Sequence, residues 1–537
     1  MDLPFRDDME RPLFAHLRRQ ARERPDKPAY IWYGATVSFA ELDRASDGFA
    51  ARLQRIGIGK GDPVALFMGN CPHYPMAQYG AQKIGAVASP CGAMDREHEL
   101  AAQLSDLGAK VIVVAEPLLP VVRNIRDRTA LKHVFVVRYA DLLPADPTIA
   151  VPEEVRARVD NGPSRPGEED FLAAARSGET PADVDVDMDD VCLIIYTSGS
   201  TGRPKGAMLT YRNAAYKTAA SVHCNGLKSD DMLLSIAPLY HIAGMIMGVN
   251  VPILSGTSTI LLHRFDPLAV LQAIDRYRVS WWYSIAPMNI AVMQHPAVGA
   301  HDLSSLRANP VTSFGVDWTE ELARQWCAHA RACASFEAAY GLSETHTVDT
   351  AMPADAVRWG THGKPVPGTR IRILDPETGR EAPPGEQGEI VVRSPGVFAG
   401  YRNRPDATAE TLRDGWVHTG DMGRMNGDGY LTFIGRFKEM IKVSGYSVFP
   451  EQVESILNLH PAVMQSAVVG MAHPTKGEAV KAFIVLRPGA QADAETIIAW
   501  ARDNMAPYKV PRAIGFLPEL PRTPAGKLLR RLLKDAD

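Results

Sequence analysis

Several features that would assign a chain to a class at once are missing from this sequence. Its six cysteines show no Cys-x-x-Cys spacing, which argues against a structural zinc site or a disulfide framework and predicts a reducing, cytoplasmic environment. No apolar run reaches the roughly 18 residues that a membrane helix requires, and segment 1–11 lacks the apolar core of a signal peptide. The net charge is only −4, so we expect no nucleic-acid partner.

The sequence does have the composition of a globular protein. Its 537 residues are 46% hydrophobic and 22% charged, and the length predicts about three or four folding units. Apolar patterns alternate between strands and helices, beginning with a strand at 63–68, a helix at 74–84 and a strand at 111–115. This alternation predicts an α/β fold whose parallel or mixed sheets are covered on both faces.

The middle of the chain continues this alternation. We predict helices at 267–277 and 318–329 and strands at 281–285 and 334–338. The most apolar stretch, 245–262, is interrupted by polar residues and glycine, and we predict buried strands joined by a turn there.

The pattern changes twice toward the C-terminus. Between 368 and 433 it consists of short β segments, and beyond residue 436 it predicts a helix at 450–457, two strands and a helix at 494–505. A compact α+β unit of about 100 residues is enough for a small domain. We therefore predict two domains, 1–435 and 436–537.

A loop rich in glycine and hydroxyl groups, Tyr196–Gly206, follows the apolar strand predicted at 191–196. Glycines let backbone N–H groups approach an anion closely, and Arg203 and Lys205 add positive charge. No Gly-Lys-Ser/Thr ends the loop, so it is not a Walker A motif. Phosphate binding and a plain flexible turn are the two interpretations of this loop taken alone.

The loop resembles the phosphate-binding signature of the adenylate-forming (AMP-binding) superfamily, which includes acyl-CoA synthetases, peptide-synthetase adenylation domains and beetle luciferases. Further matches follow in the family's order over nearly the whole chain: Pro238–Gly244, Tyr340–Glu344, Trp416–Asp421, Gly435–Gly445 and Pro521–Lys527. The resemblance implies a large N-terminal domain with two mixed α/β sheet subdomains and a small β-barrel-like subdomain. A small, mobile α+β C-terminal domain follows.

The resemblance also implies substrates and site residues. ATP and Mg²⁺ would be held by the loop and by the later motifs, with Glu344 and Thr201 as metal ligands, because ATP is handled as its magnesium complex. Lys527 would be the catalytic lysine, and Asp421 and Arg436 would contact the ribose. The remaining nucleotide-binding residues would be Thr197, Ser198, Gly199, Ser200, Gly202, Lys205, Gly315, Tyr340, Gly341 and Ser343.

Coenzyme A is the expected thiol acceptor. Lys438 falls on the family's hinge position, Gly445 would line the pantetheine tunnel, and Lys509 resembles the terminal segment of CoA ligases. A stand-alone enzyme that loads a carrier protein is the alternative. A catalytically dead nucleotide-binding regulator is a further one, which the presence of Glu344 and Lys527 argues against. The oligomeric state is open, and a homodimer is compatible with the sequence.

The acyl pocket is expected around His241, Met245, Phe314 and Gly341, with His241 also a catalytic candidate. The family usually has Ser-Gly-Gly-Ala-Pro where this chain has Ser313–Trp318, so Phe314 would reshape the pocket. Methionines and aromatics favour a medium- or long-chain fatty acid as the substrate. An aryl acid or a short branched acid is the alternative.

Overall fold

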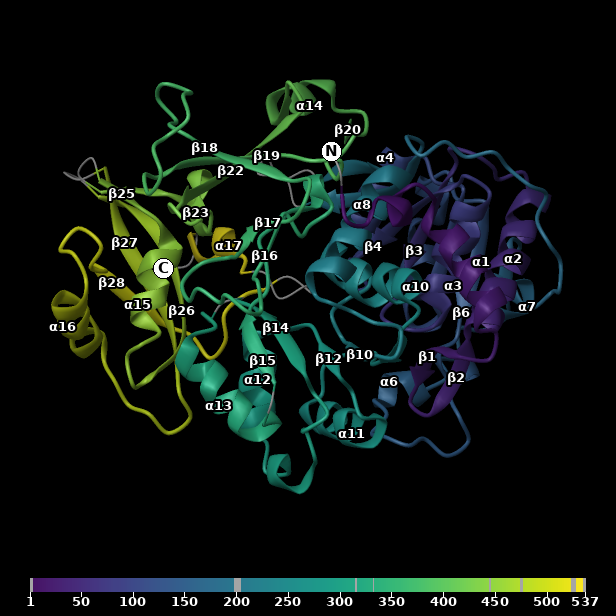
Figure 1. The fold of residues 1–537 in the computed structure, drawn as a ribbon, viewed down its shortest axis with the longest axis horizontal. Helices are drawn as coiled ribbons and strands as arrows, with labels where there is room; N and C mark the ends of the chain where they lie inside the picture. Colours follow the sequence, from purple (N-terminus) through teal and green to yellow (C-terminus); the bar gives the residue numbers. More distant parts are fainter. Residues whose placement is uncertain are drawn as a thin grey trace.

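Figure 1 shows a computed structural model of the chain, which describes residues 3–197, 204–313, 316–331, 333–443, 446–473, 477–522 and 528–534. Most of the chain, coloured purple through green, forms a large lobe. The final segment, coloured yellow-green to yellow, forms a smaller lobe at the left of the view. The predicted α/β class, with mixed sheets and a separate C-terminal α+β unit, is confirmed.

The first sheet carries the hairpin that contains the glycine-rich loop. Its strands from β7 to β8 are parallel. Strand β9 then pairs antiparallel with β8, and β20 pairs antiparallel with β9. In sheet order they are β20 (Gly400–Tyr401), β9 (Lys205–Thr210), β8 (Val191–Thr197), β4 (Val87–Cys91), β3 (Pro63–Phe67), β5 (Val111–Ala115), β6 (His133–Val137) and β7 (Glu168–Asp170).

The second sheet lies beside the first and is parallel except at one end, where β1 and β2 form a hairpin. Its order is β13 (Ser284–Ile285), β14 (Ala308–Thr312), β12 (Trp281–Trp282), β10 (Met232–Ser235), β11 (Ser258–Leu261), β1 (Pro28–Trp32) and β2 (Ala35–Ser38), with β15 (Ala334–Glu337) also paired to β14. The two sheets share one apolar core, in which Leu66 and Val113 from the first meet Leu234 and Ile260 from the second.

Helices cover both sheets (Figure 1). Apart from the helical stretch 242–255, those of the large lobe are α1 (Leu13–Glu23), α2 (Phe39–Arg55), α3 (His73–Lys83), α4 (Glu97–Leu107), α5 (Leu119–Ile125), α6 (Glu153–Arg156), α7 (Phe171–Ala175), α8 (Tyr211–Cys224), α11 (Pro267–Tyr277), α12 (Ala286–Met293), α13 (Glu320–Ala330) and α14 (Pro405–Thr411). Helix α8 is capped by Thr210, whose side chain accepts a hydrogen bond from the backbone N–H of Asn213, so the last residue of β9 is also the N-cap of this helix.

Smaller sheets follow. One contains β18 (Arg370–Leu374), β19 (Gly388–Arg393), β22 (Trp416–Met425) and β21 (Leu412–Arg413), with β23 (Leu431–Arg436) paired to β22, and β16 (Thr350–Ala351) pairs with β17 (Lys364–Pro365). The C-terminal unit contains β25 (Tyr446–Val448), β24 (Ile441–Val443), β27 (Gly477–Leu486), β26 (Val463–His473) and β28 (Ala513–Phe516), with helices α15 (Pro450–Leu457), α16 (Ala494–Asn504) and α17 (Arg530–Lys534). These smaller sheets are antiparallel except that β28 pairs with β27 in parallel orientation.

The prediction of buried strands over 245–262 is wrong. The chain there is helical through α9 (Ile242–Met245), a π-helical turn η5 (Ile246–Asn250) and α10 (Val251–Ser255), and only β11 is a strand. A continuous apolar run has no period that separates a buried helix from a buried strand. Gly256, at a φ of 71°, ends the helical stretch.

The strand predicted at 281–285 is divided at Tyr283 into β12 and β13. Both pieces pair with β14, so the break bends the strand without removing it from the sheet. Among the described residues, no helix combines the length and apolarity that crossing a bilayer requires.

Candidate active site

The glycine-rich loop connects two antiparallel strands. Thr197 at the end of β8 pairs with Lys205 at the start of β9, so the loop closes a β-hairpin at the edge where β20 is added. Its predicted phosphate-binding residues Ser198, Gly199, Ser200, Thr201 and Gly202 lie outside the described residues. The pairing with Thr197 nevertheless fixes the backbone position of Lys205 at the start of β9.

Tyr401 joins Lys205 to Glu344. The Lys205 Nζ lies 5.1 Å from the centre of the Tyr401 ring, and the Tyr401 hydroxyl donates a 2.6 Å hydrogen bond to Glu344 Oε1. The backbone carbonyl of Glu344 accepts a 2.8 Å hydrogen bond from the N–H of Phe398, just before β20. The predicted metal carboxylate and the predicted phosphate lysine are therefore brought to the same sheet edge.

A strained turn follows Glu344. After the short 3₁₀ helix η7 (Ser343–Thr345), His346, Thr347 and Val348 have φ values of 57°, 55° and 48°. β-Branched residues rarely adopt this left-handed conformation, which persists only where the surroundings enforce it. The turn packs on Gly341, where an added Cβ would lie 2.5 Å from the Val348 nitrogen.

A buried ion pair holds this turn from behind. Lys217 Nζ on α8 lies 2.6 Å from Asp349 Oδ1 and donates a 2.9 Å hydrogen bond to the Val348 carbonyl. Both side chains are 0% exposed. Asp349 also accepts a short hydrogen bond from the Thr345 hydroxyl. Because α8 continues from β9, the pair ties the glycine-rich hairpin to the Glu344 motif.

The predicted ribose-binding residues lie together on β22 and β23. Asp421 pairs with Arg436 across the two strands, and Arg436 Nε lies 3.1 Å from Asp421 Oδ1. The Tyr340 hydroxyl donates a 2.8 Å hydrogen bond to the other oxygen of Asp421. The Tyr340 ring stacks on Phe433 with centroids 5.9 Å apart and planes inclined by 27°. This tyrosine is therefore held on both its ring and its hydroxyl.

Three cations approach one another here. Lys438 lies in the 3₁₀ helix η8 (Phe437–Glu439), directly after β23. Burial lowers the pKa of Lys438, the charges of Arg436 and Lys205 lower it further, and the carboxylates of Glu439 and Asp421 oppose this shift. A bound phosphate would interact favourably with these cations.

The predicted catalytic lysine Lys527 and the tunnel residue Gly445 lie outside the described residues. On the C-terminal side of Lys527, Arg530 forms a buried cluster with Glu454 of α15, at 2.7 Å, and Glu439 of η8, at 2.5 Å. Glu439 directly follows the predicted hinge residue Lys438. Lys509 instead donates a 2.9 Å hydrogen bond to Gln452 Oε1 within the C-terminal unit.

On the acyl side, Phe314 and Gly315 lie outside the described residues, whereas Ser313 and Val316 on either side are described. His241 is exposed at the start of α9, whereas Met245 is fully buried in the main core. The N–H of Ser313 donates to both carboxylate oxygens of Glu337, at 3.2 and 3.1 Å. Burial raises the pKa of Glu337 to about 8, so this carboxyl is largely protonated at neutral pH.

Asp317 and Trp318, which depart from the family pattern, each form a hydrogen bond with a residue of another element. Trp318 is buried, and its indole N–H donates a 3.1 Å hydrogen bond to the Ser335 hydroxyl. Asp317 accepts a short hydrogen bond from Ser455 on α15, which connects the large lobe to the C-terminal unit.

Sequence reasoning missed Tyr401, Phe433, Glu337 and the Lys217–Asp349 pair. A glutamate inside the strand predicted at 334–338 was the one available signal, because a charged residue is rarely buried without a partner. The other contacts join residues from distant segments, and no local pattern indicates them.

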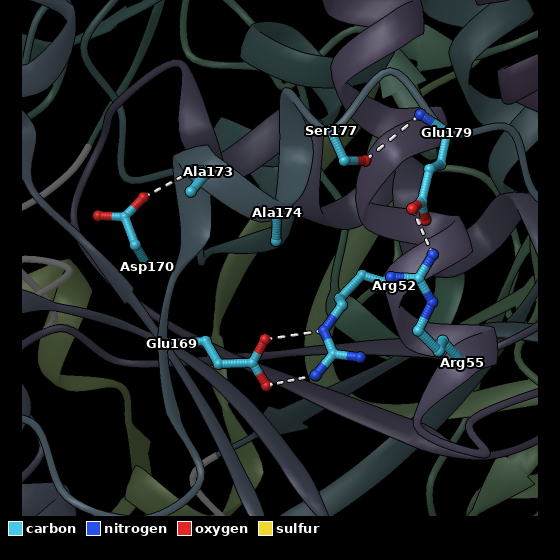
Figure 2. A pocket seen from close by; sticks show the side chains of 8 residues that line it. All are labelled: Arg52, Arg55, Glu169, Asp170, Ala173, Ala174, Ser177 and Glu179. Atoms are coloured by element: carbon cyan, nitrogen blue, oxygen red, sulfur yellow. Dashed lines mark hydrogen bonds and ion pairs between the residues drawn. The ribbon is translucent and has the colours of Figure 1, made fainter.

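A surface cavity of about 350 Å³ lies elsewhere, between α2 and α7 (Figure 2). There Arg52 binds Glu169 through two 2.7 Å hydrogen bonds, and Arg55 pairs with Glu179. These two arginines and two glutamates are thus paired with one another, and Asp170 pairs with Arg138 outside the lining. The cavity shares no lining residue with the site at β20, β22 and β23.

Comparison with known proteins identifies the family. The AMP-binding enzyme profile matches residues 17–402, and the profile of the AMP-binding enzyme C-terminal domain matches residues 452–527. A long-chain-fatty-acid–CoA ligase of Bacillus subtilis (strain 168) is 33% identical over 527 residues, covering 96% of this chain and 92% of the relative. A feruloyl-CoA synthase of Amycolatopsis sp is 36% identical over 516 residues, covering 95% and 96%.

Similarity in structure extends over the whole chain. The crystal structure of the anthranilate CoA ligase AuaEII in complex with anthranoyl-AMP matches with a TM-score of 0.85 at 26% identity, covering 100% of this chain and 98% of that chain. The chain therefore belongs to the AMP-binding enzyme family, in its acyl-CoA ligase branch.

Proposed function

We propose that the site at β9, β20, β22 and β23 activates a carboxylic acid as its acyl-adenylate, and that the acyl group then passes to the thiol of CoA. The observation that carries this proposal is a set of contacts: Tyr401 joins Lys205 to Glu344, and Arg436 pairs with Asp421, two residues before Lys438. Cations to hold phosphates, a carboxylate for a metal and a second carboxylate for ribose hydroxyls are the groups that bound ATP requires.

A magnesium ion fits beside Glu344. In phosphate chemistry this ion is usually held by one or two carboxylates together with substrate phosphates. Glu344 is the carboxylate that such a site would use, because Tyr401 joins it to the predicted phosphate lysine Lys205. When bound, magnesium would neutralise phosphate charge. Thr201 is the second proposed ligand.

The first half-reaction follows from the leaving group. A carboxylate is a poor acyl donor, and joining it to the α-phosphate of ATP makes AMP the leaving group. A carboxylate oxygen attacks the α-phosphate, and pyrophosphate departs. The protein contributes mainly position and charge. We assign Lys527 to the charge that shifts between the attacking carboxylate and the phosphate, which suits a compact ammonium group.

In the second half-reaction the CoA thiol attacks the acyl carbonyl and AMP leaves. We propose that the C-terminal domain, from residue 436, rotates about Lys438 between the two steps and brings Gly445 to the thiol path. The Arg530–Glu439 contact supports this coupling, because it joins a residue three positions after Lys527 to the residue beside the hinge.

For the acid, we propose a medium- or long-chain fatty acid, supported by the similarity to the fatty-acid–CoA ligase of Bacillus subtilis. The second candidate is an aromatic acid. Similarity to the feruloyl-CoA synthase, at 36% identity, and to the complex with anthranoyl-AMP supports it.

A panel of acids distinguishes these proposals. Octanoate, palmitate, benzoate, ferulate and isobutyrate would each be incubated with ATP and Mg²⁺, with and without CoA, and AMP and thioester would be measured. We expect CoA-dependent AMP release with the fatty acids. Adenylation without CoA thioester, together with transfer to an acyl carrier protein, would favour the carrier-loading alternative. No pyrophosphate exchange with any acid would contradict the assignment as a ligase.

A further inference from the structure

We propose that Tyr401 is a positioning residue that aims two groups at bound Mg·ATP: the carboxylate of Glu344 toward the metal and the ammonium of Lys205 toward the phosphates. This inference rests on the proposed function, because it takes Glu344 as the metal carboxylate. Its basis is that one side chain contacts both groups, through its hydroxyl and its ring respectively.

The hydroxyl fixes the rotation of the Glu344 carboxylate. It donates a 2.6 Å hydrogen bond to Oε1. A tyrosine hydroxyl is protonated at neutral pH, so it serves here as the donor. The other oxygen, Oε2, accepts no hydrogen bond from a residue in the described part of the chain, so it is available to a cation. Hydrogen bonds to a metal-binding carboxylate act in this way in other metal sites.

The ring stabilises the position of the Lys205 ammonium. A cation about 5 Å from a tyrosine ring centre is within the range of cation–π attraction. Lys205 is also the β9 residue that pairs with Thr197, so its backbone is fixed at the end of the glycine-rich loop. The ring therefore limits which way the flexible four-carbon side chain points.

Tyr401 is itself held rigidly. Its strand β20 pairs with β9 at Tyr401↔Ala207, and its N–H donates a 2.9 Å hydrogen bond to the Thr408 hydroxyl. The ring of Phe398 meets its ring edge-on, with centroids 4.8 Å apart. A positioning residue needs such support, because a site held loosely loses its geometry.

The test is calorimetric binding of ATP to the full-length protein, with Mg²⁺ and with EDTA in its place, in the absence of acid and CoA. The Y401F variant keeps the ring and removes the hydroxyl. We expect it to reduce the Mg²⁺-dependent gain in ATP affinity about tenfold and to leave metal-free binding unchanged. The Y401L variant removes both contacts, and we expect it also to weaken metal-free binding roughly two- to fivefold.

The matched control is Y211F. Tyr211 is buried in the same lobe, and its hydroxyl donates a hydrogen bond of the same length, 2.6 Å, to the Gln82 carbonyl, away from Glu344. We expect Y211F to bind ATP like the wild type with and without Mg²⁺. An unchanged Mg²⁺-dependent gain in Y401F, or an equal loss in Y211F, would overturn the inference.

The E344Q variant separates this inference from the proposed function. If E344Q abolishes the Mg²⁺-dependent gain while Y401F leaves it intact, the metal assignment stands and the role of Tyr401 is wrong. If E344Q leaves the gain intact, the metal assignment itself is wrong, and the positioning role of Tyr401 fails with it.

Discussion

Replacing Lys217 by methionine should destabilise the large lobe strongly, and more at pH 7 than at pH 5. Lys217 and Asp349 are both 0% exposed, and their Nζ and Oδ1 atoms are 2.6 Å apart. Methionine fills much of the space but leaves the aspartate without a counter-charge. Removing one partner of a buried ion pair costs about 3–5 kcal/mol.

The pH dependence gives an independent estimate of the stability that K217M loses. Burial raises the pKa of Asp349 and the charge of Lys217 opposes this, so without the lysine the carboxyl should stay protonated in the folded protein. The unfolded chain ionises it near pH 3.9, and keeping it protonated at pH 7 costs roughly 4 kcal/mol. A folded-state pKa above the unfolded value means stability that is lost as the pH rises, so the cost at pH 5 falls to roughly 1.5 kcal/mol.

Urea unfolding followed by tryptophan fluorescence at both pH values measures this difference, since seven of the eight tryptophans, all but Trp500, precede residue 436. K83M is the matched control. Lys83 is also 0% exposed, but its partners Asp43 and Asp47 are 17% exposed. Water can therefore solvate these carboxylates when the lysine is removed, and we expect K83M to lose less stability than K217M. The K217M/D349L double variant should recover most of the loss. A K217M penalty that is below about 1 kcal/mol at pH 7, or equal at the two pH values, would refute the reasoning.

Three further predictions concern the C-terminal unit. K527A should lower adenylation roughly 100- to 1,000-fold and retain thioester formation from supplied acyl-adenylate, and equal loss of both half-reactions would contradict the role of Lys527. G445L should spare pyrophosphate exchange and block thioester formation; impaired exchange would point to misfolding. Burial raises the pKa of Glu451 to about 7, so stability is lost as the pH rises through 7. E451Q should remove this pH dependence, which amounts to a change of up to roughly 3 kcal/mol in the free energy of unfolding. Thermal unfolding measured from pH 5 to 8 tests this.

Local patterns predicted many elements accurately. The strand at 111–115 and the helix at 450–457 have the predicted limits, because each is a short apolar or amphipathic segment between clear breaks. The stretch 245–262 was predicted wrongly, because uniform hydrophobicity carries no period. Register, sheet order and the division of the strand at Tyr283 depend on neighbours far along the chain.

The amino-acid sequence by itself determined the family, the order of the motifs and the identity of the groups that could hold a nucleotide. It could not show how those groups meet. Tyr401 contacts Glu344 across 57 positions, and Lys217 contacts Asp349 across 132. Such pairs form only when β20 pairs with β9 and α8 packs behind the left-handed turn. Motifs are local chemistry that a sequence displays directly, whereas orientation and burial are set by packing between distant segments, which only the tertiary structure decides.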